Sequence, residues 1–125
     1  DYDYFFKFID FADKEDIPSS LLLYNEVVES GFDSHHFIGG LSSHYRNLLV
    51  CKNPKSIELL EVPDTIKERY IEQAKAVDSL LIMRALNALS KADVAYKASK
   101  NQRLLVEVCL MELCSLKQEQ EKEKP

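Results

Sequence analysis

Two glutamates interrupt the most apolar stretch of the chain and are the first candidates for chemistry. Residues 101–116 include ten apolar residues, and their only acids are Glu107 and Glu112. A carboxylate in apolar surroundings can act as a general base, because desolvation raises its pKa. Buried carboxylates are more often paired with a cation, and we favour this structural interpretation. The candidate cations are Arg46, Arg84 and Arg103.

Three histidines could ligate a metal or exchange a proton near neutral pH. His35 and His36 are adjacent, so they point to different sides of a helix and cannot form the i, i+4 pair of a helical metal site. We expect both to be solvated and His44 to be hydrogen-bonded. The histidines therefore predict no metal site, and we expect no cofactor in this chain.

The three cysteines, Cys51, Cys109 and Cys114, lie at apolar positions of helical patterns. Their odd number and the lack of a C-x-x-C spacing argue against a disulfide framework and a zinc site. We expect reduced thiols in the core of a cytosolic protein.

Motifs of several enzyme classes are missing from the 125 residues. The sequence has no G-x-x-x-x-G-K-[ST] phosphate loop, no H-E-x-x-H zinc motif and no G-x-S-x-G nucleophile motif. Catalysis within this chain is therefore not expected. It also shows no signal peptide and no run of about 20 apolar residues that could span a membrane.

The charge is acidic overall and unevenly distributed. The formal net charge is −5, with nine acids and two bases in residues 1–33 but seven acids and ten bases in residues 34–100. The bases of the middle segment are interspersed with acids, whereas nucleic-acid-binding surfaces are usually basic and clustered. No direct nucleic-acid binding is predicted.

The elements that must position these residues are helices. Only three Gly and four Pro occur, and apolar residues recur at helical spacing. We expect a single all-α bundle of about five to six helices with short connections. The predicted helices cover residues 2–12, 18–30, 34–51, about 63–77, 78–99 and 101–116, with a short one at 54–60.

Several residues are expected to begin or end these helices. Asp33 or Ser34 can cap the third helix, Asp78 the long fifth one, and Ser99 or Asn101 the last, while Gly31 suits a left-handed C-cap. The alanines of residues 78–99 make that helix slim, which suits close packing against the opening helix. Gly39 and Gly40 would be tolerated in the third helix if a neighbour crosses closely there.

The last helix is expected to be buried on all sides, because its apolar residues cover almost its whole circumference. Residues 117–125 are charged and have nothing to bury, so we expect a disordered tail or the start of a linker. The first residue is not Met, and we expect the natural protein to extend beyond this piece.

Two segments taken together resemble a known family. Residues 44–49 read His-Tyr-Arg-Asn-Leu-Leu, and residues 99–107 read Ser-Lys-Asn-Gln-Arg-Leu-Leu-Val-Glu. They are similar to the C-terminal collar domain of the gamma/tau subunit of the bacterial DNA polymerase III clamp loader. Gln102 stands where that family more commonly has Pro. The turn at residues 31–33 and the aromatic opening helix resemble the same domain.

The resemblance implies that residues 1–116 are a helical assembly module. In the family, these domains associate with other gamma/tau copies and with the delta and delta-prime subunits, and hold the ATP-driven pentamer together in the bacterial cytoplasm. ATP and Mg would bind only in preceding ATPase domains. The residues expected to be structural or at subunit interfaces are Arg46, Asn47, Asn101, Arg103 and Glu107.

A second interpretation stays open. A stand-alone helical ligand-binding or regulatory domain could enclose a small apolar molecule beside Glu107. An enclosed cavity at that position would favour it.

Overall fold

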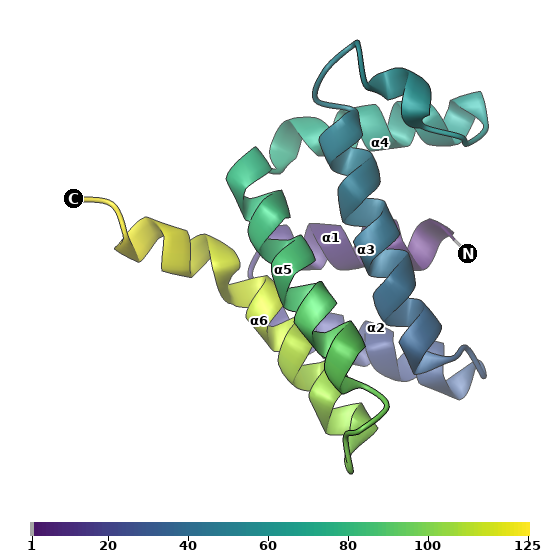
Figure 1. Cartoon of the computed structure of the whole chain (residues 1–125), viewed down its shortest axis with the longest axis vertical. Coiled ribbons are helices and arrows are strands. Elements are labelled where there is room, and N and C mark those ends of the chain that lie inside the picture. The colour runs from purple at the N-terminus through teal and green to yellow at the C-terminus, as the bar shows by residue number, and fades with distance from the viewer. Residues whose placement is uncertain (1) are drawn as a thin grey trace.

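The computed structural model describes residues 2–125 and is helical throughout, as the all-α prediction requires (Figure 1). Its elements are α1 (Tyr2–Asp13), α2 (Ile17–Glu29), α3 (Ser34–Val50), the 3-10 turn η1 (Ile57–Leu59), α4 (Asp64–Ala76), α5 (Ser79–Ala95) and α6 (Gln102–Lys122). The expected helix at residues 54–60 is thus reduced to a turn and η1.

Helix starts follow the predicted caps. The side chains of Asp33, Asp78 and Asn101 accept hydrogen bonds from the backbone N–H three residues later, at 3.2, 3.3 and 3.0 Å. These bonds satisfy N–H groups that have no partner inside the first turn. Asp16 caps α2 in the same way, by accepting from the Ser19 N–H at 3.1 Å.

At two of the glycines a side chain would be unfavourable. Gly31 ends α2 with φ +86°, a left-handed conformation that disfavours other residues. At Gly40, a Cβ would overlap the ring of Phe5, so α1 crosses α3 closely at this point. The expected close crossing is confirmed at Gly40, whereas the space beside Gly39 is open.

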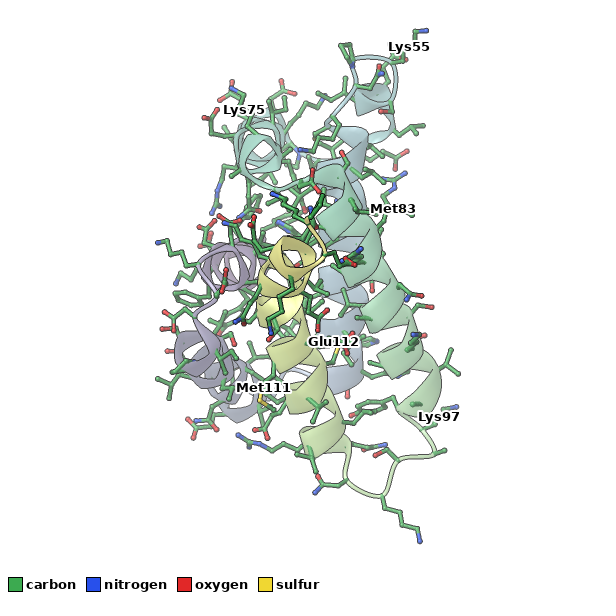
Figure 2. All side chains as sticks on the ribbon, turned by 90° about the vertical axis from the view of Figure 1, so that its left-hand side faces the viewer. Lys55, Lys75, Met83, Lys97, Met111 and Glu112 are labelled. Carbon is green, nitrogen blue, oxygen red and sulfur yellow. The ribbon has the colours of Figure 1, made fainter. Side chains whose placement is uncertain are left out.

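The core lies between α1, α2, α3, α5 and α6. Helix α5 packs chiefly on α3 and α6, and α6 lies between α5 on one side and α1 and α2 on the other (Figures 1 and 2). The prediction that α5 packs against the opening helix, α1, is therefore wrong, since its main neighbours are α3 and α6. The small residues Ala85, Ala88 and Ala92 are buried in the contacts that α5 does make.

Helix α6 is not buried on all sides. Leu104 and Val108 remain 50% and 49% exposed, because its neighbours cover only part of its circumference. The buried residues of α6 are Val106, Cys109, Leu110, Leu113, Cys114 and Leu116.

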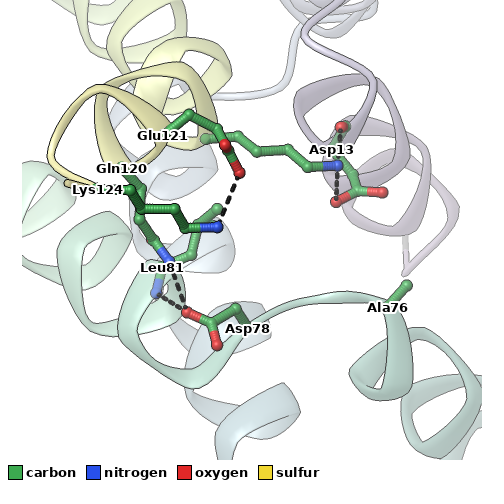
Figure 3. Close-up of a pocket in the computed structure, with 8 residues that line it drawn as sticks. Asp13, Ala76, Asp78, Leu81, Gln120, Glu121 and Lys124 are labelled. Carbon is green, nitrogen blue, oxygen red and sulfur yellow. Dashed lines mark hydrogen bonds and ion pairs between the residues drawn. The ribbon is translucent and has the colours of Figure 1, made fainter.

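The end of α6 also differs from the prediction. The helix continues to Lys122 instead of ending near Leu116, so the expected disorder of this segment is wrong up to that residue. Its last turns dock on the start of α5. The Gln120 side chain donates to Asp78 at 3.1 Å (Figure 3). Arg84 pairs with Glu123 at 2.6 Å.

Candidate functional site

The five predicted structural or interface residues fall into two separate groups. Asn101, Arg103 and Glu107 lie at the start of α6, and Arg46 and Asn47 lie on α3. The structure thus brings the three residues of the last helix together, but it does not join them to Arg46.

The group on α6 ties this helix to α2. Arg103 pairs with Glu107 at 3.1 Å and donates to the Asn25 side chain at 2.9 Å. Its guanidinium also lies 5.8 Å from the centre of the Tyr24 ring, within the range of a cation–π contact. Asn101 caps the same helix. Of the three candidate cations, Arg103 is the one that pairs with Glu107, so this carboxylate is an ion-pair partner.

The other two candidate cations have different partners. The Arg46 guanidinium donates to the side-chain oxygen of the neighbouring Asn47 at 3.0 Å, and Arg84 pairs with Glu123. Arg46 is exposed on α3. The sequence alone does not show which side of α3 faces α6, so it left Arg46 among the candidate partners of Glu107.

His44 forms the centre of a buried polar junction between α3, α4 and α1. Its Nε2 lies 2.7 Å from the Gln73 carbonyl oxygen, which confirms the expected hydrogen bond. The Gln73 amide donates to the Phe6 backbone oxygen at 2.9 Å and to Asp10 at 2.8 Å. The other ring nitrogen, Nδ1, is buried and has no hydrogen-bond partner among residues 2–125.

This environment keeps His44 neutral. Burial lowers its pKa from 6.5 to about 4, and the hydrogen bond that His44 donates to Gln73 and the charge of Asp10 only partly oppose that shift. The rings of Phe6 and Tyr70 pack against the imidazole, at centre distances of 4.5 and 4.7 Å. The junction is thus a structural element whose protonation is costly.

The prediction that His35 is solvated is only partly right, because its side chain is 36% exposed but also has partners on α5. Its Nε2 lies 2.7 Å from Asp93, and its ring stacks on Tyr96 at 4.5 Å, so it joins α3 to the end of α5. Asp93 is 58 residues away in sequence. No local pattern could have identified this pair. His36 is exposed, as expected.

The cysteines are free thiols, as expected, and two of them are buried. Burial raises the pKa of Cys109 to about 12 and also raises the pKa of Cys114. A thiol with a raised pKa supplies little thiolate, so neither residue suits nucleophilic chemistry.

The exposed apolar side chains are concentrated on one hairpin. Within residues 2–125, eight large apolar side chains are exposed, and five of them lie on α5 and α6. We call these five the α5–α6 face: Leu80, Met83, Val94, Leu104 and Val108. Figure 2 shows Met83 pointing away from the bundle.

A groove runs between α5 and α6 beside this face. Its volume is about 230 Å³. Lys91 and Glu112 line it together with apolar and small residues: Ala88, Ala92, Ala95, Leu105, Val108 and Cys109. Glu112, the second glutamate of the apolar stretch, is therefore exposed at a groove and is not buried.

A small hollow lies between helices of the bundle, away from Glu107. It is lined by residues of α1, α3, α5 and α6 and the residue after α4, and it has a volume of about 10 Å³. Such a space holds no more than about one water molecule. It cannot take the small apolar ligand of the second interpretation, since ligand pockets usually have about 300–1,000 Å³.

The described part of the chain contains no group of three or more His, Cys, Asp or Glu side chains that could hold a metal ion. Its helices include none that is both long enough and apolar enough to cross a membrane. In comparisons with known proteins, no family model, no curated protein and no solved structure matches the chain.

Proposed function

We propose that this chain is an assembly module, namely the collar domain of a gamma/tau subunit of a bacterial clamp loader. The observation that carries the proposal is the α5–α6 face, where five of the eight exposed large apolar side chains gather on two adjacent helices. Exposed apolar surface concentrated in this way is typical of protein–protein contacts.

The residues behind the family resemblance support this role through their positions. Asn101 caps α6, and Arg103 ties the start of α6 to Asn25 on α2. The first contact fixes where α6 begins and the second holds α6 to α2, and α6 supplies Leu104 and Val108 to the face. In the proposal, the shared residues orient a docking surface and take no part in chemistry.

The proposal assigns the other activities of the loader to other parts of the complex. ATP and Mg would bind in ATPase domains that precede the collar, and the chain itself would bind neither nucleotide nor DNA. Its partners would be other gamma/tau copies and the delta and delta-prime subunits, in the bacterial cytoplasm.

The test is reconstitution of the loader. A full subunit lacking the segment equivalent to residues 2–116 would be mixed with delta and delta-prime, and the products measured by native mass spectrometry. We expect the pentamer to be lost while the ATPase domains stay folded. Formation of a normal pentamer from the shortened subunit would rule out the proposal.

The matched control is a full subunit carrying Leu59→Glu. Leu59 is 57% exposed on η1, outside the α5–α6 face, so this variant adds a charge without touching the proposed surface. We expect it to assemble like the parent.

A further inference from the structure

The last turns of α6 lie outside the apolar core. Leu116 is the last buried residue of the chain, and every residue of 117–123 is exposed or half-buried. In Figure 1 this part of α6 extends beyond the bundle toward the C-terminus. Apolar burial holds the rest of α6, but it contributes little to the position of these turns. We call residues 117–123 the α6 strap.

Two ion pairs hold the strap to other helices. Glu123 pairs with Arg84 on α5 at 2.6 Å. Lys117 pairs with Asp13 at the end of α1 at 3.6 Å. The four side chains keep 32% to 55% of their surface exposed. Ion pairs as exposed as these contribute little free energy and are weakened by salt.

A third contact uses an oxygen atom that also caps a helix. Asp78 Oδ2 accepts the Leu81 backbone N–H at 3.3 Å and the Gln120 side-chain N–H at 3.1 Å (Figure 3). The carbonyl oxygen of the Gln120 side chain is buried and has no hydrogen-bond partner among residues 2–125. A buried acceptor without a partner is unfavourable, so it opposes the docking of the strap.

A hollow of about 260 Å³ lies beside the docked strap. It is found where the strap meets the ends of α1 and α4 and the start of α5 (Figure 3). Leu81 lines it and also lines the small hollow between the helices, together with Tyr45 and Leu113. The strap therefore lies over an apolar part of the bundle without packing tightly against it.

We propose that the α6 strap is a lid that opens as a unit after Leu116 while the bundle below it stays folded. Three polar contacts close it, and the buried acceptor and the hollow make the closed state only slightly favourable. Segments with few buried apolar contacts open at a lower free energy than the core. Salt controls the lid, because it weakens both ion pairs. The lid is a property of this chain alone and does not depend on the collar assignment.

Amide hydrogen exchange of the 125-residue chain, followed by mass spectrometry, measures the opening. Raising the salt concentration from about 0.01 M to about 1 M shortens the Debye length from about 30 Å to about 3 Å. We expect exchange in the strap to become at least about twofold faster, while exchange in residues 106–114 of α6 stays the same. A peptide of residues 117–125 corrects for the effect of salt on the intrinsic exchange rate.

Charge reversal distinguishes a docked strap from ordinary fraying of a helix end. At low salt, Arg84→Glu and Glu123→Arg should each make exchange in the strap about two- to fivefold faster, which is the effect of losing an exposed ion pair. The double variant restores the pair with exchanged charges and should return toward the rate of the parent.

Matched controls exist on both sides of this pair. Lys91→Glu lies on α5 and Glu119→Arg lies on the strap. Both residues are exposed and take part in none of the ion pairs within residues 2–125. The two control variants should therefore exchange like the parent.

A chain that ends at Leu116 tests whether the bundle is stable without the strap. It lacks three surface contacts but no buried apolar side chain, so its thermal midpoint should fall by less than about 10 °C. Thermal unfolding followed by circular dichroism measures the midpoint.

Four outcomes would overturn the inference. The first is strap exchange that does not respond to salt after correction. The second is exchange like that of the parent in both reversal variants, or a double variant that does not recover, since either result indicates fraying. The third is an equal rise in exchange over residues 106–114, which indicates opening of the whole bundle. The fourth is a much larger fall of the midpoint in the shortened chain.

Discussion

The α5–α6 hairpin and the α3–α4 junction are held to the bundle by different kinds of contact. The hairpin is fixed by apolar burial, with Ile82 and Leu89 on α5 and Leu110 and Leu113 on α6 at 0–2% exposure. Helix α4 buries only Tyr70 and Ala74. The two kinds of contact differ in physical origin. Apolar burial is non-directional and independent of pH, whereas hydrogen bonds are directional, and a bond made by an ionisable group such as His44 depends on pH.

Polar contacts also attach α4 to the bundle. Gln73 joins it to His44 and to the Phe6 backbone, and the Lys52 ammonium group donates to the carbonyls of Ala74 and Val77 at the helix end. A cation at this position supplies a donor to carbonyls at the C-terminal end of the helix and interacts favourably with its dipole. The junction should therefore respond to pH and to single polar substitutions, and the hairpin should not.

The largest expected effect is in the hairpin. Leu110→Ala should lower the free energy of unfolding by about 3–4 kcal/mol, because it removes buried apolar surface and leaves a cavity. Leu104→Ala, on the same helix but 50% exposed, should cost less than about 1 kcal/mol. Urea denaturation measures both. Equal losses at the two leucines would contradict the assignment of buried and open sides to α6.

The next effect is the pH dependence of the junction. The pKa of His44 falls from 6.5 in the unfolded chain to about 4 in the folded one, so the unfolded chain binds the proton more readily between these values. The contribution of neutral His44 to the free energy of unfolding is complete above pH 6.5, and it is lost as the pH falls from about 6.5 through about 4. The change amounts to roughly 3 kcal/mol.

Denaturation midpoints between pH 7 and pH 4 check this prediction. His44→Gln should flatten the profile, while His36→Gln should leave it unchanged, because the His36 side chain is 84% exposed. A profile that is the same for His44→Gln and the parent would show that other groups cause the acid sensitivity.

A smaller loss is expected when the partner of His44 is removed. Gln73→Ala leaves the His44 Nε2–H buried without its acceptor and should cost about 2 kcal/mol at pH 7. Amide hydrogen exchange should increase in α4 more than in α6, because Gln73 also bonds to α1. A uniform increase over both helices would show that α4 is not a locally held element.

The smallest effect is expected at the surface pair of α6. Glu107→Gln removes the ion pair with Arg103 and should cost about 0.5 kcal/mol, since an exposed i, i+4 pair contributes little. Arg103→Ala also removes the bond to Asn25 and should cost more. A loss above about 2 kcal/mol for Glu107→Gln would show that this ion pair stabilises the fold far more than a surface pair does.

The sequence by itself determined the helices and most of their starts. The sequence predicts Asp78 as a cap, and Asp33 and Asn101 each as one of two candidates, because a cap bonds to an N–H only three residues away. The pairing of Glu107 with Arg103 was among the alternatives for a similar reason, since residues four apart share a helix face.

Only the tertiary structure decided which surfaces are covered. The pattern of α6 predicted burial on every side, yet Leu104 and Val108 are open because no neighbouring helix lies over them. His35 meets Asp93, and Gln120 meets Asp78 and extends α6, across 58 and 42 residues. Contacts of this range depend on how the helices pack and not on the residues within one turn, so no local pattern contains them.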